Sequence, residues 1–134
     1  MVHYEHMTYT IHADSTAQHD ASLTIKDTAI DFGTTESTAA VLPNPAELFL
    51  GSFAACILKN VERFSQTYES AHIEVTAVRL DRPPRMDSVR YVLTITSSDR
   101  KLRTELLKKN IEKFGTIYNT VQNACSVSGT IEKK

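Results

Sequence analysis

Two cysteines are the residues best suited to chemistry in this chain of 134 residues, Cys56 and Cys125, and 69 positions separate them. No C-x-x-C pair is present, so their spacing fits no zinc motif. A thiolate attacks peroxides and disulfides, and a second thiol can trap the sulfenic acid that results. Two interpretations are therefore open: the cysteines are buried apolar residues, or they form a redox pair.

The elements that must position these thiols follow from local patterns. A helix is expected over residues 45–68, with Cys56 in its middle. Asn44 can cap this helix, Pro45 suits its first position, and Glu47 can close a capping box with Asn44. Residues 48–58 are apolar almost all round, which predicts a central helix buried on every side and packed across a sheet.

The other elements are predicted from periodicity and turn residues. Apolar residues alternate with polar ones in stretches that we read as strands, at residues 9–13, 23–25, 30–32, 73–77, 89–95 and 127–131. Helices are expected over residues 99–113 and 116–123, and Cys125 follows the second of them. This order is typical of an α+β fold, and the length suits one domain over residues 1–134.

The composition excludes several classes of protein. The chain has 15 basic and 16 acidic residues, which argues against a globally basic nucleic-acid binder. No apolar run approaches the roughly 20 residues of a membrane helix, and the N-terminus does not resemble a secretory signal. We therefore expect a soluble, cytoplasmic protein without nucleic-acid or membrane partners. The histidines show no ligand spacing apart from the terminal group His3, Glu5 and His6, so no metal or other cofactor is expected.

Two further groups of residues leave alternatives open. Phe49 and Phe53 fall at helical spacing, so they either belong to the core or line a pocket for an apolar substrate. Four arginines surround the Pro83-Pro84 turn, namely Arg79, Arg82, Arg85 and Arg90. They either form a solvated hairpin, bind phosphate, or reach the site of a partner subunit.

The sequence around each cysteine resembles a known family. The segment NPAELFLGSFAAC at residues 44–56, with NACSVSG at residues 123–129, is similar to the signature of the OsmC/Ohr family of osmotically inducible and organic hydroperoxide resistance proteins. The resemblance implies an OsmC-like fold, with strands around a long buried helix, in an intertwined homodimer. It also implies reduction of organic hydroperoxides without metal or haem. Cys56 would be the peroxidatic residue and Cys125 the resolving one, and a dithiol reductant would reopen their disulfide.

The chain departs from this family at two positions that tune the thiol. The resemblance implies a glutamate directly after the helix-starting proline, where this chain has Ala46, and an arginine early in the chain, where none precedes Arg63. Glu47 and His19 are possible auxiliary residues. Glu47 instead fits the capping box, because nine residues place it on the opposite side of the helix from Cys56, and His19 instead fits an exposed loop. The alternative function is a non-catalytic protein that binds a small molecule or senses redox state.

Overall fold

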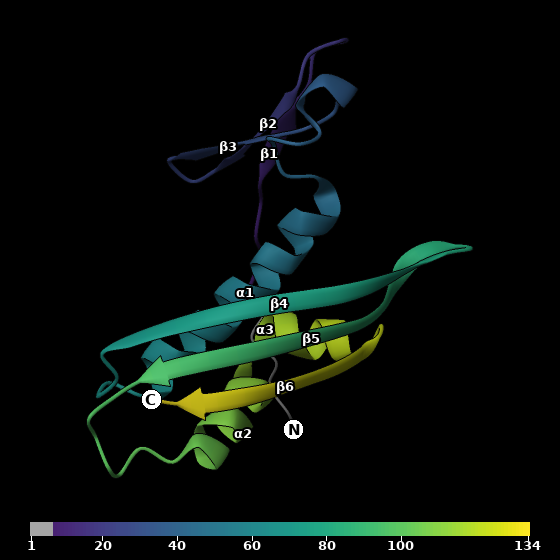
Figure 1. Ribbon diagram of the computed structural model, residues 1–134. Helices are drawn as coiled ribbons and strands as arrows, with labels where there is room; N and C mark the ends of the chain where they lie inside the picture. Colours follow the sequence, from purple (N-terminus) through teal and green to yellow (C-terminus); the bar gives the residue numbers. More distant parts are fainter. Residues whose placement is uncertain (1–6) are drawn as a thin grey trace, which may run out of the picture. The chain divides into compact units, whose positions relative to one another are not determined.

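The computed structural model describes residues 7–134, so the terminal group His3, Glu5 and His6 lies outside the described residues. The described chain forms two compact units, one that ends at Leu48 and one that spans Phe49–Lys134. The elements in chain order are β1 (His12–Asp14), β2 (Ala21–Ile25), β3 (Thr28–Phe32), the 3-10 helix η1 (Glu36–Thr38), α1 (Pro45–Phe64), β4 (Ser70–Asp81), β5 (Pro84–Thr96), α2 (Thr104–Phe114), α3 (Thr116–Gln122) and β6 (Ser126–Lys133) (Figure 1).

The first unit is a small antiparallel sheet in the order β1-β2-β3. Asp20, just before β2, connects this sheet to the segment around η1. One of its carboxylate oxygens accepts hydrogen bonds from the backbone N–H of Thr34 (3.0 Å) and of Thr35 (3.1 Å) and from the Thr38 hydroxyl (2.8 Å). These donors hold the pKa of Asp20 below its usual value, and they fix the loop that leads toward α1.

The start of α1 is the capping box that the sequence predicted. The backbone N–H of Glu47 donates to the Asn44 side-chain oxygen at 2.9 Å, and the backbone N–H of Asn44 donates to the Glu47 carboxylate at 3.1 Å. Pro45 is the first helical residue, where its missing N–H costs no hydrogen bond. The Glu47 carboxylate is therefore engaged in a hydrogen bond at the start of the helix.

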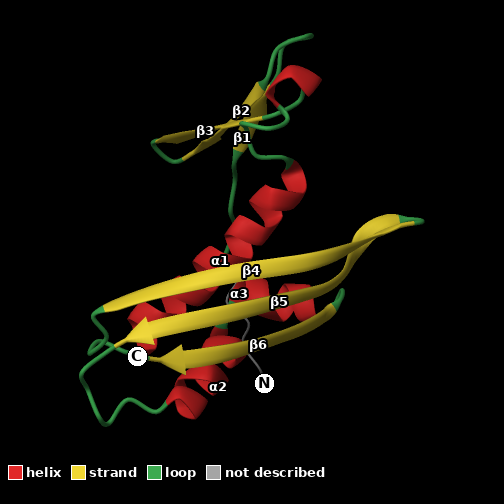
Figure 2. Ribbon diagram, viewed as in Figure 1, coloured by secondary structure: helices red, strands yellow, loops and turns green. Residues whose placement is uncertain are grey.

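The second unit contains a sheet in the order β4-β5-β6. A long antiparallel hairpin pairs β4 with β5, from Ser70 opposite Thr96 to Asp81 opposite Pro84. β6 runs parallel to β5, and a parallel pair requires a long crossover connection. Helices α2 and α3 supply that crossover, and Figure 2 shows them with α1 on one face of the sheet.

The core of the second unit lies between this sheet and its helices. The predicted alternation in β5 is confirmed, because Val89, Tyr91, Leu93 and Ile95 are all buried. Residues from all three helices complete the core, namely Phe53, Ile57, Val61, Leu107, Ile111, Tyr118 and Val121. The α+β class is thus confirmed, and within residues 7–134 no helix has the length and apolar character that crossing a membrane requires.

Three details differ from the sequence-based expectations. Within one chain α1 is not buried on every side, because Phe49 is 41% exposed and Leu58 is 36% exposed. α1 also ends at Phe64 instead of residue 68, since the next residues bond to the end of β5, where the Ser97 hydroxyl donates to the Thr67 carbonyl at 2.9 Å.

The third difference concerns the start of α2, which lies at Thr104 and not at residue 99. The sequence pattern predicted a helix from residue 99. The Asp99 carboxylate instead accepts a hydrogen bond from the Lys101 backbone N–H at 2.9 Å. This bond closes a local turn, so helical hydrogen bonding begins only after the turn.

Candidate active site

Cys56 projects from the middle of α1 toward the break between α2 and α3. Gly115 forms this break, and a Cβ atom added to it would lie 3.1 Å from the Cys56 sulfur and 2.9 Å from Cβ of Tyr118. The absence of a side chain at Gly115 therefore leaves the room that the Cys56 sulfur occupies. No local sequence pattern connects Gly115 with Cys56, because the two residues lie in different helical segments that are far apart along the chain.

Cys125 lies between the end of α3 and the start of β6. Its backbone N–H and its thiol both donate to the Val121 carbonyl, at 3.0 Å and 3.6 Å. Burial raises the pKa of this thiol, the nearby Asp87 carboxylate raises it further, and the Arg85 guanidinium opposes both effects. Arg85 and Asp87 come from β5, whose parallel pairing with β6 starts beside Cys125.

Both cysteines belong to the second unit and pack against its hydrophobic core. Both are free and half-buried residues. Their pairing as a disulfide, and their separate roles, stay predictions.

The raised pKa of Cys125 predicts a slow alkylation with a marked pH dependence. In a Cys56→Ser background, iodoacetamide should modify Cys125 more slowly at pH 7 than it modifies a free cysteine, because only the thiolate reacts. The rate should rise as the pH rises through the elevated pKa. Mass spectrometry of timed samples measures this rate.

Two variants that each remove one charge test the cause of the raised Cys125 pKa. Asp87→Asn should speed the alkylation and Arg85→Gln should slow it, each by about twofold to fivefold, the range of exposed charge pairs. The two variants are matched, because each replaces one charge on β5 by an amide. Equal effects in the same direction would contradict this account of the electrostatics.

The other predicted site residues occupy different settings. Phe53 is fully buried in the core, with its ring centroid 5.9 Å from that of Tyr118, as the core interpretation predicted. Phe49 is partly exposed near the start of α1. His19 is exposed in the loop between β1 and β2, where its backbone N–H donates to the Thr16 carbonyl at 3.0 Å. Roles for these residues in binding or in tuning a thiol stay predictions.

A polar cluster beneath the sheet was missed by sequence reasoning. The Glu112 carboxylate accepts a hydrogen bond from the Tyr91 hydroxyl at 2.9 Å and one from the Lys108 ammonium at 2.7 Å. Burial, followed by the charge of Glu112, raises the pKa of Tyr118 to about 12, and the same causes raise the pKa of Tyr91. The only sequence signal was the i, i+4 spacing of Lys108 and Glu112, which does not reveal the tyrosines.

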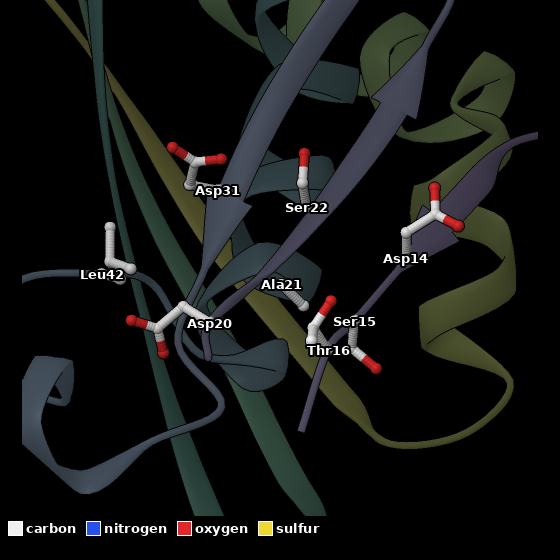
Figure 3. A pocket seen from close by; sticks show the side chains of 8 residues that line it. All are labelled: Asp14, Ser15, Thr16, Asp20, Ala21, Ser22, Asp31 and Leu42. Carbon is white, nitrogen blue, oxygen red and sulfur yellow. The ribbon is translucent and has the colours of Figure 1, made fainter. Parts of the chain in front are cut away.

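The first unit contains a cavity of about 380 Å³ whose walls carry mainly carboxylates and hydroxyls. Figure 3 shows Asp14, Asp20 and Asp31 at separate points around it. Within residues 7–134, no three His, Cys, Asp or Glu side chains are grouped as metal ligands would be.

Near the hairpin turn, Arg79 and Asp81 form an exposed ion pair at 3.7 Å, so this part of the arginine group is solvated.

The sequence matches the model of a known protein family. The family model described as OsmC-like protein matches residues 36–130. The chain belongs to the OsmC-like family. This family match spans Cys56, Gly115 and Cys125, the three residues that shape the candidate site.

Solved structures agree with this OsmC-like assignment at the level of fold. An OsmC-like protein from Mycoplasma pneumoniae superposes with a TM-score of 0.83 at 16% identity, covering 95% of this chain and 97% of that one. The organic hydroperoxide resistance protein OhrB of Bacillus subtilis gives 0.59 at 17% identity, with 96% and 98% covered. An organic hydroperoxide resistance protein from Legionella pneumophila gives 0.67 at 14% identity, with 95% and 99% covered. A comparison with curated proteins finds no match.

Proposed function

We propose that this OsmC-like protein is a thiol-dependent peroxidase that reduces organic hydroperoxides through Cys56 and Cys125. The observation that carries the proposal is the placement of two free, half-buried cysteines against one core cluster, although they are far apart in sequence. The redox-protein family and the names of the Bacillus and Legionella relatives support the same chemistry.

The proposed reaction has three balanced steps. The Cys56 thiolate attacks one peroxide oxygen of ROOH, the O–O bond breaks, and the alkoxide takes a proton to leave as ROH. The Cys125 thiol then condenses with the Cys56 sulfenic acid, which forms a disulfide and releases water. A dithiol reductant finally reduces that disulfide and is itself oxidised to a disulfide. A reducing cytoplasm, our proposed location, supplies such dithiols.

The electrostatics around Cys125 support this division of roles. Because burial raises its pKa, this thiol stays protonated near neutral pH and is a poor first nucleophile. Condensation with a sulfenic acid comes later and needs only proximity. We therefore assign the attack on peroxide to Cys56 and the trapping step to Cys125.

We also propose that the active species is a homodimer. Phe49 and Leu58 each leave apolar surface of α1 exposed, and a second copy of the chain would cover such surface. Cys56 lies between these two residues along the same helix. In such a dimer Phe49 would border the site and could contact the apolar part of a hydroperoxide.

A second candidate function is supported by the absence of the residues that would tune the thiol. The position after Pro45 is Ala46, no arginine precedes Arg63, and the Glu47 carboxylate already caps α1. A chain without those partners would keep the fold and the thiols but react slowly with peroxide. It would then bind a small molecule or sense redox state.

A single-turnover reaction separates the two candidates. One equivalent of cumene hydroperoxide added to the reduced protein should give one equivalent of cumyl alcohol and a Cys56–Cys125 disulfide in a non-reducing peptide map. Hydrogen peroxide should react more slowly, since it lacks an apolar body. Cys56→Ser should abolish alcohol formation, and Cys125→Ser should yield one equivalent of alcohol and a sulfenic acid without the disulfide. Unchanged thiols in the native protein would reject the peroxidase and favour the second candidate.

A further inference from the structure

The end of α2 is the point from which the chain leads toward Cys125. α2 ends at Phe114, Gly115 interrupts the helical run, and α3 then extends to Gln122, shortly before Cys125. The last four carbonyl groups of a helix have no donor within that helix, and in α2 they belong to residues 111–114. The groups that bond to these carbonyls therefore affect where α3 and Cys125 lie.

An asparagine of α1 bonds to one of these carbonyls. The side-chain N–H of Asn60 donates to the Ile111 carbonyl at 3.4 Å, across 51 positions of the chain. This distance exceeds that of a typical N–H···O bond. Asn60 is nevertheless only 7% exposed, so its amide has little access to water, and a buried amide is unfavourable without a partner. Asn60 thus connects α1 with the end of α2.

A second asparagine bonds to the same end of α2 from the other side. The side-chain N–H of Asn119, in α3, donates to the Lys113 carbonyl at 3.0 Å. The backbone N–H of Asn119 also donates to the Gly115 carbonyl at 2.9 Å. The break at Gly115 is therefore held by two amides, one that comes from α1 and one that comes from α3.

The carbonyl that Asn60 binds is a neighbour of the Cys56 thiol. Asn60 follows Cys56 by four residues, so both side chains lie on the same face of α1. A Cβ atom added to Gly115 would lie 3.0 Å from the Ile111 carbonyl oxygen and 3.1 Å from the Cys56 sulfur. These two atoms therefore border the same small space. Movement of Ile111 away from α1 would widen that space and shift the start of α3.

We propose that Asn60 and Asn119 are positioning residues for the pairing of Cys56 with Cys125. They hold the break at Gly115 against α1, and through α3 they set the approach of the Cys125 sulfur to the Cys56 sulfur. This inference rests on the proposed function, in which that pairing is the trapping step. A displacement of about 1 Å can slow a reaction between oriented groups by up to about 100-fold.

The equilibrium between dithiol and disulfide tests this role without a peroxide. The full chain is equilibrated in mixtures of reduced and oxidised glutathione, and acid-quenched samples are analysed by mass spectrometry for the Cys56–Cys125 disulfide. Asn60→Leu and Asn119→Ala should each lower the equilibrium constant for this disulfide by about threefold to tenfold, the range that the net contribution of one hydrogen bond implies.

The reaction with one equivalent of cumene hydroperoxide gives a second readout. Both variants should form the disulfide more slowly by a similar factor, and their sulfenic acid should accumulate. The release of cumyl alcohol should stay within about twofold of the native rate, because the attack on peroxide precedes the pairing. Should Asn60→Leu fail to fold, Asn119→Ala carries both measurements, since its hydrogen bond lies at the surface.

Two matched controls remove similar hydrogen bonds at other places. Thr120→Ala deletes a donor next to Asn119 that bonds to the Thr116 carbonyl at 2.9 Å, within α3 and not across the break. Ser97→Ala deletes the donor to the Thr67 carbonyl, which joins the end of β5 to the segment after α1. Both controls should lower the free energy of unfolding and leave the disulfide equilibrium within about twofold of the native value.

The remaining outcomes separate this inference from the proposed function. Equal shifts of the disulfide equilibrium in the controls and in the asparagine variants would indicate a general loss of stability and overturn the positioning role. An unchanged equilibrium in both asparagine variants would overturn it as well and leave the peroxidase intact. An equilibrium that depends on Asn60 and Asn119 in a protein inert to cumene hydroperoxide would support the positioning role and reject the peroxidase. A native chain that forms no Cys56–Cys125 disulfide would overturn both.

Discussion

A Gly129→Ala variant is expected to be strongly destabilised. A Cβ atom at this position in β6 would lie 2.0 Å from a ring carbon of Tyr91, far inside van der Waals contact. Tyr91 is 1% exposed and its hydroxyl is held by Glu112, so the ring cannot move aside without breaking that bond. We expect a loss in the free energy of unfolding at or above the upper end of the roughly 1–3 kcal/mol typical of overpacking.

Urea denaturation followed by circular dichroism measures this loss. Gly51→Ala is the control, because a Cβ atom there meets nothing within 4 Å and Gly51 lies inside α1. That control should stabilise the chain by up to about 1 kcal/mol through helix propensity. The Gly129→Ala variant should regain part of its stability when Tyr91→Leu is added. A native-like Gly129→Ala protein would contradict the close contact between Tyr91 and β6.

A Gly115→Ala variant is expected to destabilise the protein by about 1–3 kcal/mol through the same physical cause. The added Cβ atom would lie 2.9 Å from Cβ of Tyr118, 3.0 Å from the Ile111 carbonyl oxygen and 3.1 Å from the Cys56 sulfur. Two of these neighbours are backbone or backbone-proximal atoms, so they cannot rotate away. Part of this loss, on the order of 1 kcal/mol, reflects the preference of an N-cap for glycine over alanine.

A double-mutant cycle assigns part of that loss to the sulfur. Cys56→Ala removes the Cys56 sulfur, so combining it with Gly115→Ala should cost less stability than the sum of the two single changes. An interaction of at least about 0.5 kcal/mol is expected for residues in direct contact. Strict additivity would mean that the Cys56 sulfur does not occupy the space beside Gly115, and the geometry of the candidate site would then be wrong.

Local sequence patterns predicted two kinds of feature well: hydrogen bonds between residues close in sequence, and the regular alternation of buried side chains in a strand. The capping box between Asn44 and Glu47 spans three residues, and both of its predicted hydrogen bonds are present. The alternation around Val89 and Tyr91 predicted the buried face of β5. These features depend on neighbours along the chain, so the residue order is sufficient to specify them.

Element ends were less predictable because tertiary contacts and local turns both compete with helical hydrogen bonds. Nothing in the residues after Phe64 forbids helix, yet α1 ends there because the Thr67 carbonyl accepts from Ser97. Similarly, Asp99 is a good cap by type, but it bonds to Lys101 in a turn. The first contact joins segments that are far apart in sequence, and the second closes a local turn. The spacing of apolar residues predicts neither of them.

Residue order was sufficient to predict the α+β class, the helix that carries Cys56, the helix that precedes Cys125, and the family resemblance that the family model confirms. Three features became visible only in the folded chain: Gly115 makes room for the Cys56 sulfur, β6 lies parallel to β5, and Glu112 accepts a hydrogen bond from the Tyr91 hydroxyl. The two groups of features differ in the sequence separation of the residues that create them. Periodicity and caps are fixed by residues a few positions apart, whereas steric fit and buried polar contacts depend on segments that meet only when the core closes.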